Sequence, residues 1–599
     1  MSKIKLSDYI AKRLKEVYEV DRFFMVSGGG AMHLNDSLGR YIPYTCNHHE
    51  QACSIAAEGY ARVNQKLAVV NITTGPGGLN CMNGLFGQWT DSVPVLYISG
   101  QVKRRTMMTS FPDLNVRQLG DQEVDIISVV KPLTKYAVCV TDANDIKYHL
   151  DRAIYEATTG RKGPCWIDIP IDIQAALIEE DELKEFDKES LEVLKLGSLD
   201  DIKKTVSKLE SSKRPLIVAG HGIRLAGQID NFKKLVNELK IPVVTTFNGF
   251  DIMDDDNPYY IGRIGTIGQR TGNFALQNAD LVLCLGTRNN IRQASYNFEN
   301  FAKNAYKIVV DIDKFELEKP LVIPDMKINA DLADFIPNLL ESFSTLKPQD
   351  FKTFVNWLSF CKNLKEKYSF INHSEVEQKD DVIEPYHFTY SLTKCLKEGD
   401  TLTMANGSAC VCTFQNALVK PNQRYILNSG NASMGYGLPC AIGASYQAQR
   451  VICLEGDGSI MMNIQELQTV VHNNLPIKIF VINNSGYSSI RQTQRNFFNG
   501  NMTGSGVESG VSVPDFVKVA QSFGLKAKRI SNPKTMEEEI KEVLNFDGPI
   551  LCEVMTEKEY AFLPKLSSKI LSDGTMVSAT LEDMYPFLPR DEFEENMIK

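Results

Sequence analysis

The sequence lacks the features that mark several classes of protein. It contains no run of 18 apolar residues, so no segment is apolar enough to cross a membrane as a helix. It has a net charge of −9 and no long basic run, which argues against nucleic acid as a partner. Its 13 cysteines form no CxxC pair and no cluster with histidine, which argues against disulfides and zinc. The first 20 residues lack the apolar core of a signal peptide and predict an amphipathic helix, so we expect a cytoplasmic protein with reduced, buried thiols.

The pattern of the chain predicts three α/β domains. At 599 residues the chain is too long for one core. Two charged, polar stretches, residues 179–195 and 362–381, are predicted linkers. Between them, short apolar strands alternate with helical patterns, which is typical of parallel sheets. The predicted strands are residues 67–72 and 93–99, then 216–219, 243–246, 281–285 and 308–312, and finally 451–454, 477–482 and 550–554.

The most informative stretch contains a Gly-Asp-Gly motif at residues 456–458, directly after a predicted strand. A helix predicted to begin at Asn463 leads into the next strand, which ends at residues 483–484. This connection makes the two strands parallel, so Asp457 and Asn484 meet at one sheet edge. One carboxylate and one amide oxygen suit a hard cation that keeps sites free for phosphate and water. Because glycines let the backbone approach a diphosphate, the stretch predicts a magnesium–diphosphate site.

This stretch resembles the GDG-x24-NN signature of thiamine diphosphate (ThDP) enzymes. Similarity to the acetohydroxyacid (acetolactate) synthase branch of that family extends over nearly the whole chain. It rests on SGGGAM, AAEGYAR, TTGPGGLN and GRKGPCWIDIP, then RPLIVAGHGIRLAG and NADLVLCLGTR, and finally NASMGYGLPCAIGA. The resemblance implies an α/β fold of three doubly wound parallel-sheet domains: a pyrimidine-binding domain (1–180), a middle nucleotide-binding-like domain with a possible FAD site (196–350) and a diphosphate-binding domain (375–560). A C-terminal tail (561–599) follows them.

The resemblance also implies residues for the metal and the cofactor. Asp457, Asn484 and Gly486 would hold Mg²⁺. Met434 matches the bulky residue that props ThDP in its bent shape, although a methionine on an apolar segment is ordinarily core filler. The Ala432 carbonyl would accept from the cofactor's amine. The other residues implied at ThDP are Ser27, Thr74, Gly407, Ser408, Ala409, Gly456, Gly458, Ser459 and Tyr487, with the backbone amides of Ser408 and Ala409 on the diphosphate.

Glu50 is the residue that we expect to activate the cofactor. It follows residues 44–49 and starts a predicted helix, where an acid is ordinarily favoured by the helix dipole. In the family, a carboxyl group here hydrogen-bonds the pyrimidine N1′ and promotes the imino tautomer. Gln122 is the second implied catalytic residue. For His48 and His49 we expect capping or packing roles instead.

The middle domain matches the part of the family that binds FAD. Glycine-rich turns are a weak signal, because many tight turns need glycine, and related domains are empty or hold another nucleotide. The resemblance favours FAD with a structural rather than a redox role. The implied residues are Arg161, Gly220, Gly222, Arg224, Gly286, Arg288 and Asp311.

Three positions depart from dedicated acetolactate synthases. Ile171 replaces a lysine, Asp121 a phenylalanine and Thr493 a tryptophan. Together they exchange an apolar, aromatic acceptor pocket with a cation for a roomier, more polar one. The tail resembles those of ThDP enzymes in surface-polysaccharide pathways, some of which add a two-carbon unit to a nucleotide-linked keto sugar.

The resemblance therefore implies a carboligase that uses ThDP and Mg²⁺ to decarboxylate a 2-oxo acid, pyruvate being the expected one, and to transfer the two-carbon unit to a carbonyl acceptor. The acceptor is either a keto sugar or a second 2-oxo acid, the latter making an ordinary acetolactate synthase. A simple decarboxylase is an alternative, although the His-His pair frequent in decarboxylases is missing from residues 101–122. A non-catalytic regulatory homologue is a third alternative, against which the presence of Glu50, Asp457 and Asn484 argues. The family implies a homodimer or homotetramer with active sites at the subunit interface.

Overall fold

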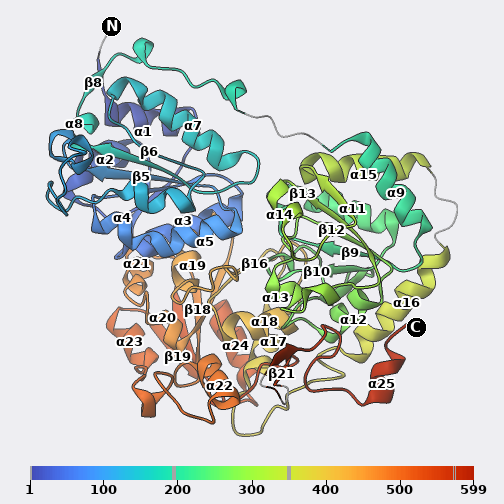
Figure 1. Cartoon of the computed structure of the whole chain (residues 1–599). Helices are drawn as coiled ribbons and strands as arrows, with labels where there is room; N and C mark the ends of the chain where they lie inside the picture. Colours follow the sequence, from blue (N-terminus) through green and yellow to red (C-terminus); the bar gives the residue numbers. More distant parts are fainter. Residues whose placement is uncertain (1–2, 192–196, 347–351, 571–572, 574, 599) are drawn as a thin grey trace.

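The computed structural model describes residues 3–191, 197–346, 352–570, 573 and 575–598. Three six-stranded sheets dominate it, and every pair of neighbouring strands within them is parallel. In Figure 1 the first domain lies above the third, and the middle domain lies beside both. The predicted α/β fold with three parallel-sheet domains is confirmed.

The first sheet has helices on both faces. Its strand order is β3-β2-β4-β5-β7-β6. Helices α1, α2 and α7 bury apolar side chains against one face, and α3, α5 and α6 against the other. The predicted N-terminal amphipathic helix is α1, which buries Leu6, Ile10 and Leu14. The elements are β2 (Phe23–Met25), β3 (Tyr44–Cys46), β4 (Ala68–Ile72), β5 (Val95–Gln101), β6 (Tyr136–Cys139) and β7 (Cys165–Pro170), with α1 (Leu6–Glu16), α2 (Met32–Tyr41), α3 (Glu50–Asn64), α4 (Pro76–Asn80), α5 (Met82–Asp91), α6 (Ile126–Val130), α7 (Ile146–Thr158) and α8 (Ile171–Gln174).

The middle sheet is also covered on both faces. Its strand order is β11-β10-β9-β12-β13-β14. Helices α9, α11 and α15 pack on one face, and α12 and α16 on the other. The elements are β9 (Pro215–Ala219), β10 (Val243–Thr245), β11 (Tyr260–Arg263), β12 (Leu281–Leu285), β13 (Tyr306–Asp311) and β14 (Met326–Asn329), with α9 (Leu199–Ser211), α10 (Gly222–Leu225), α11 (Ile229–Leu239), α12 (Arg270–Asn278), α13 (Ile291–Ala294), α14 (Lys314–Glu318), α15 (Leu332–Leu346) and α16 (Lys352–Lys367).

The third sheet has the order β16-β15-β17-β18-β20-β19. Helices α17, α18 and α24 pack on one face, while α19, α21 and α23 pack on the other, in a core shared with the first domain. The elements are β15 (Thr401–Met404), β16 (Arg424–Ile426), β17 (Val451–Gly456), β18 (Lys478–Asn483), β19 (Lys526–Ile530) and β20 (Ile550–Met555), with α17 (Pro385–Cys395), α18 (Ser408–Asn416), α19 (Gly437–Ala444), α20 (Asp457–Ile460), α21 (Glu466–His472), α22 (Ser488–Phe497), α23 (Phe516–Ser522) and α24 (Met536–Asn545).

The first and third domains are joined where α3 crosses α19. A Cβ atom on Gly59 would lie 2.2 Å from the Cys440 carbonyl oxygen, and one on Gly443 would lie 1.8 Å from that of Ala56. Only glycine fits at these two positions, because the helix backbones touch. The crossing therefore fixes how the two domains meet within one chain.

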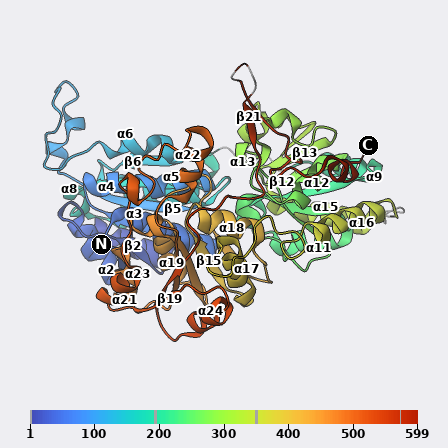
Figure 2. The same ribbon diagram turned by 90° about the horizontal axis from the view of Figure 1, so that it is seen from below.

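The tail returns from the third domain to the middle domain. Its elements are β21 (Ser568–Ile570), β22 (Met576–Ser578) and α25 (Arg590–Glu595). Figure 2 shows this return, with the C-terminus on the side of the middle domain. Side chains of α12 hold the tail: the amide of Asn273 donates to the Leu581 carbonyl at 3.0 Å and that of Asn278 to the Asn596 carbonyl at 2.8 Å.

Two local predictions need correction. The helix predicted to begin at Asn463 begins at Glu466, because Asp457–Ile460 forms its own short helix, α20, at the end of β17. The predicted linker 362–381 is helical at its start, since α16 continues to Lys367 and buries Leu364. In the other predicted linker, residues 192–195 lie outside the described residues, as do both predicted ends of the middle domain.

Ten of the 13 cysteines are buried, and all 13 are unpaired. Within the described ranges, no helix is both long and apolar enough for a membrane span.

Candidate functional site

A cavity of about 390 Å³ lies at the carboxyl ends of the third-domain strands. The loops after β15, β16, β17 and β18 form most of it, as expected where parallel strands end at one sheet edge. Phe247, Ile267 and Arg292 of the middle domain and Phe562 of the tail complete the wall. The lining includes most of the residues predicted for the diphosphate and the metal: Gly407, Ser408, Ala432, Met434, Gly456, Asp457, Gly458, Ser459, Asn484, Gly486 and Tyr487.

Asp457 and Asn484 form a pair suited to a divalent cation. Asp457 Oδ2 accepts hydrogen bonds from the backbone N–H groups of Asn484 (3.0 Å) and Gly486 (2.9 Å), and its Oδ1 from that of Gly458 (2.6 Å). Burial raises the pKa of Asp457 to about 6. The Asn484 Oδ1 is buried and has no hydrogen-bond partner among the described residues. A hard cation would supply the partner that this oxygen lacks, so the donor set fits Mg²⁺.

Two helices begin at the cavity. Helix α18 begins at Ser408 after Gly407, whose φ of 62° favours glycine, and α22 begins at Ser488. The unpaired N–H groups of a first helical turn favour an anion. Ala409 is buried in the first turn of α18 and is not one of the residues that line the cavity.

The segment around Met434 is held firmly beside the cavity. The backbone N–H of Gly435 donates to Ser459 Oγ at 2.8 Å, and Asn463 Nδ2 donates to the Gly435 carbonyl at 2.8 Å. The Ala432 carbonyl accepts from Asn406 Nδ2 at 3.1 Å. Met434 therefore presents its side chain from a fixed backbone.

Glu50 begins α3 in the first domain. Its Oε2 accepts from Asn80 Nδ2 at 2.9 Å. His49 caps the helix, with its Nδ1 accepting from the backbone N–H of Gln51 at 3.0 Å, which confirms the capping role expected for His49.

The turn after β4 brings Glu50 and Gln122 to one place. Gly75 has φ 65°, and a Cβ there would lie 2.0 Å from the Gln122 carbonyl oxygen. A Cβ on Gly77, two residues on, would lie 3.5 Å from Glu50 Oε1. Thr74 in the same turn bonds the Gly100 carbonyl at 3.0 Å, and Ser27 follows β2 at the same sheet edge. None of these first-domain residues lines the third-domain cavity, because every lining residue lies between Phe247 and Phe562 in the sequence.

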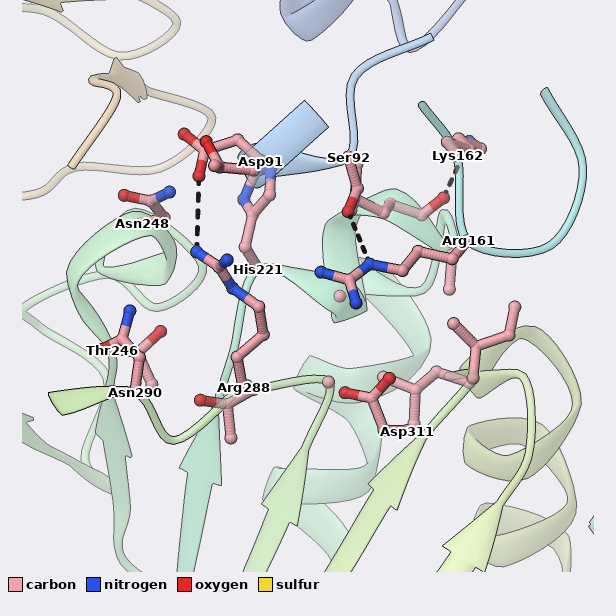
Figure 3. A pocket seen from close by; sticks show the side chains of 18 of the residues that line it. Asp91, Ser92, Arg161, Lys162, His221, Thr246, Asn248, Arg288, Asn290 and Asp311 are labelled. Carbon is pink, nitrogen blue, oxygen red and sulfur yellow. Dashed lines mark hydrogen bonds and ion pairs between the residues drawn. The ribbon is translucent and has the colours of Figure 1, made fainter. Parts of the chain in front are cut away.

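A second cavity, of about 320 Å³, lies between the first and middle domains. Its lining includes Arg161, Gly222, Gly286, Arg288 and Asp311 of the residues predicted for FAD. Figure 3 shows Arg288 reaching Asp91 and Arg161 reaching Ser92 across this cavity. The two cavities are adjacent, because they share Phe247, Arg292 and Ser429.

The charges of this second cavity are only partly available to a ligand. Arg161 is paired with Asp313 at 2.7 Å and Glu316 at 2.9 Å, whereas Arg288 lies 3.7 Å from Asp91. Asp311 ends β13, where a carboxylate suits ribose hydroxyls, and burial raises its pKa to about 6. The residues present fit a nucleotide with a ribose and a diphosphate.

Gly220 and Arg224 lie outside the lining of this cavity. A Cβ on Gly220 would lie 2.2 Å from the Gly286 carbonyl oxygen, so the contact between the two turns by itself requires glycine. Arg224 pairs with Asp251 at 3.2 Å in a buried charge cluster where the three domains meet. These two residues thus have structural partners.

Three parts of the chain, one in each domain, match family models of thiamine pyrophosphate enzymes. Residues 4–128 match the N-terminal TPP binding domain, residues 202–339 the central domain and residues 405–554 the C-terminal TPP binding domain. The chain belongs to the thiamine pyrophosphate enzymes. ThDP is therefore its cofactor, and the third-domain cavity lies within the segment that matches the C-terminal binding domain.

Similarity to three relatives shows to which branch of the ThDP enzymes the chain belongs. It is 32% identical to the acetolactate synthase large subunit of Pyropia yezoensis over 91% of this chain and 90% of that protein. It is 31% identical to that of Lactococcus lactis over 96% and 97%. It is 29% identical to the isozyme 2 large subunit of Escherichia coli over 90% and 93%. The chain is an acetolactate synthase-like enzyme that transfers an acyl unit to form a carbon–carbon bond.

The three departures lie outside the third-domain cavity of this ThDP enzyme. Asp121 is exposed beside Gln122, and Ile171 begins α8 at the carboxyl end of β7. Thr493 is exposed on α22, one turn after Ser489, which lines the cavity. Within one chain, therefore, these residues do not form a common wall of that cavity.

Sequence reasoning missed several residues at the third-domain cavity. Asn406 holds the Ala432 carbonyl, and Phe562 and Tyr560 reach the cavity from the segment after β20. Asn406 directly precedes the predicted Gly407 loop, and that position could have signalled it. No pattern in the sequence marks Phe562 or Tyr560, because they arrive from an irregular segment.

Proposed function

We propose that this chain is a Mg²⁺-dependent carboligase that decarboxylates pyruvate and transfers the two-carbon unit to a carbonyl acceptor other than pyruvate. The observation that carries the proposal is the Asp457–Asn484 pair at the cavity, with one buried carboxylate and one amide oxygen that has no hydrogen-bond partner in the described ranges. Asp457, Asn484 and the Gly486 backbone would hold Mg²⁺. When bound, ThDP supplies the electron sink for the decarboxylation.

The chain's own residues would bind and orient the cofactor and would hold a proton toward its pyrimidine ring. The N–H groups of Ser408 and Ala409 at the start of α18 would bind the diphosphate oxygens, because they have no carbonyl partner within the helix. Met434 would support the cofactor from the rigid segment after β16. Glu50 would hold a proton toward the pyrimidine, and its hydrogen bond to Asn80 orients the carboxyl group.

The site would be completed by a second copy of the chain. The cavity that contains Asp457 has no first-domain residue in its wall, while Glu50, Thr74 and Gln122 gather at a different sheet edge. Apolar side chains are exposed near both places: Leu79 and Phe86 in the first domain with Glu50, and Met461 and Ile490 in the third domain with Asp457. A two-fold dimer that joins the two edges would cover these side chains and make two equivalent sites.

The acceptor proposal rests on the three departures. In such a dimer, Asp121 and Ile171 of one chain would face the α22 surface of the other, which carries Thr493. Without the lysine and the aromatic rings, this mouth suits a larger, more polar acceptor, such as a nucleotide-linked keto sugar. The second candidate is ordinary acetolactate synthesis from two pyruvate molecules, which the names of the relatives favour.

The second cavity would hold FAD in a structural role. The lining cations Arg288 and Arg292 would meet the pyrophosphate, and Asp311 would meet ribose hydroxyls. Arg288 forms an ion pair with Asp91 at 3.7 Å, which is longer than a hydrogen bond, and this supports a role for Arg288 at the pyrophosphate.

Product analysis by mass spectrometry tests the proposal. The protein is supplied with ThDP, Mg²⁺ and pyruvate, alone and with a panel of ketones and keto-sugar nucleotides. We expect release of CO₂ that depends on both ThDP and Mg²⁺, and a product two carbons longer than one added acceptor. Free acetaldehyde as the sole product would identify a decarboxylase instead.

A further inference from the structure

Tyr560 reaches the metal and diphosphate end of the cavity from the irregular segment after β20. Its hydroxyl accepts from Ser488 Oγ at 2.9 Å and from Asn484 Nδ2 at 3.4 Å, and it shares a further hydrogen bond with Ser408 Oγ. These partners belong to the start of α22, the loop after β18 and the start of α18. One hydroxyl thus links the three segments that surround the predicted ligands.

The backbone of Tyr560 is anchored, so the hydroxyl has a fixed place. Its carbonyl accepts from Gln492 Nε2 on α22 at 3.1 Å. The neighbouring Lys558 carbonyl accepts from the Arg491 guanidinium at 2.9 Å. The ring packs edge-on against Phe562, with centroids 5.9 Å apart.

This anchoring acts on the Asn484 amide. The nitrogen of the amide contacts the hydroxyls of Tyr560 and Ser408, each at 3.4 Å, while its oxygen has no hydrogen-bond partner in the described part of the chain. Because the two atoms are on opposite sides of the amide carbon, fixing the nitrogen also fixes where the oxygen points. Such outer partners of metal ligands typically change metal affinity about 10–100-fold when removed.

The same contacts direct the proton of Ser408. Ser488 and Asn484 donate to the Tyr560 oxygen, and the tyrosine hydroxyl has one proton of its own to donate. With its acceptor sites used, the hydroxyl can donate this proton to Ser408 Oγ. The Ser408 hydroxyl, which lines the cavity, then has its own proton free for a phosphate oxygen.

We propose that Tyr560 is a positioning residue of the metal–diphosphate site, which orients the Asn484 amide oxygen toward Mg²⁺ and the Ser408 hydroxyl toward the diphosphate. The proposal rests on the proposed function, because it assumes that Asn484 is a metal ligand.

Calorimetric titration of Mg²⁺ into full-length protein with saturating ThDP tests it. Tyr560→Phe keeps the ring and removes only the hydroxyl, and we expect Mg²⁺ to bind at least about tenfold more weakly. Tyr425→Phe is the matched control, because its buried hydroxyl bonds Gln423 (3.1 Å) and the Leu418 carbonyl (3.3 Å), remote from the metal residues. Wild-type Mg²⁺ affinity in Tyr560→Phe, or an equal loss in both variants, would overturn the proposal.

A double-mutant cycle tests the route through Asn484. In an Asn484→Ala background there is no amide left to orient, so adding Tyr560→Phe should change Mg²⁺ affinity less than about twofold. A full additive loss would contradict the proposed route. If wild-type protein itself binds no Mg²⁺ with ThDP, the proposed function fails; if it binds Mg²⁺ and Tyr560→Phe binds equally well, only the role of Tyr560 fails.

Discussion

The Asp457 carboxylate accepts a 3.0 Å hydrogen bond from the backbone N–H of Asn484, 27 residues further along the chain. This bond connects the ends of two adjacent parallel strands, β17 and β18. It also holds a carboxylate and an amide side chain at one sheet edge before any ligand binds. A metal can then bind without the entropic cost of ordering two loops.

The pKa of Asp457 predicts how Mg²⁺ binding depends on pH. Burial raises this pKa from 3.8 to about 6. Asp457 therefore takes up a proton at a higher pH than an exposed aspartate does. Protons and Mg²⁺ compete for the same carboxylate. With ThDP present, we therefore expect Mg²⁺ affinity to be constant above about pH 7 and to fall by up to about tenfold per unit below pH 6.

Calorimetry between pH 5 and 8 measures this dependence. Mg²⁺ binding to free ThDP over the same range is the control, since it reports the titration of the cofactor itself. After that correction, a flat affinity between pH 5 and 7 would show that Asp457 does not hold the metal.

Mixed dimers test whether two chains share each site. Glu50→Gln and Asp457→Ala chains should each be inactive as homodimers. If the sites are shared, one of the two sites in a mixed dimer carries both changes and the other carries neither, so up to about half of wild-type activity per dimer should return. Co-expression with two affinity tags isolates the mixed species. Inactive mixed dimers of confirmed composition would rule out the shared site.

Removal of the Asp251 carboxylate should destabilise the junction of the three domains. Burial alone would raise the pKa of Asp251, but the charges of Arg224 and Arg424 lower it to about 2. Asp251→Ala leaves two buried arginines without this counter-charge, and we expect a loss of about 3–5 kcal/mol in unfolding free energy. Asp583→Ala, which breaks the exposed pair with Arg590, should cost under about 1 kcal/mol. Equal urea midpoints for the two variants would contradict this assignment.

The second cavity predicts the colour of the protein. Purified protein should be yellow, with flavin released on denaturation, and Arg288→Gln should lower flavin content several-fold by removing a cation from the cavity wall. Arg529→Gln is a control, because Arg529 pairs with Glu553 in the third domain. Reduction of the flavin should leave carboligation largely intact. A colourless, fully active protein would disprove FAD binding.

The sequence predicted nine of the 18 strands in the three sheets, because these nine are apolar runs with clear ends. It also predicted that Asp457 and Asn484 meet, since a βαβ connection leaves little choice of topology. The predicted start of α21 was wrong by three residues. Residues Asp457–Ile460 form a separate short helix, and the N-cap residue of α21, Gln465, makes no side-chain capping hydrogen bond that would mark the true start.

Contacts between segments that are far apart in the chain could not be predicted from the sequence. Tyr560 meets Ser408 across 152 positions, and Arg424 meets Asp251 across 173. Neither pair has a periodic pattern, because each depends on how complete domains pack. The helix at the start of residues 362–381 was missed for a related reason: its surface is polar, and the apolar Leu364 is buried by its neighbours.

A competition between acceptors tests the central claim most directly. Wild-type protein with ThDP and Mg²⁺ receives isotope-labelled pyruvate and a keto-sugar nucleotide together, and mass spectrometry follows both products. Because Ile171, Asp121 and Thr493 replace a cation and two aromatic rings, we expect acetolactate to form about ten- to a hundredfold more slowly than the sugar product, equivalent to roughly 1–3 kcal/mol. Ile171→Lys with Thr493→Trp should shift the ratio toward acetolactate. If wild-type protein makes acetolactate faster than any product with the sugars or ketones, it is an ordinary acetolactate synthase and the proposed acceptor is wrong.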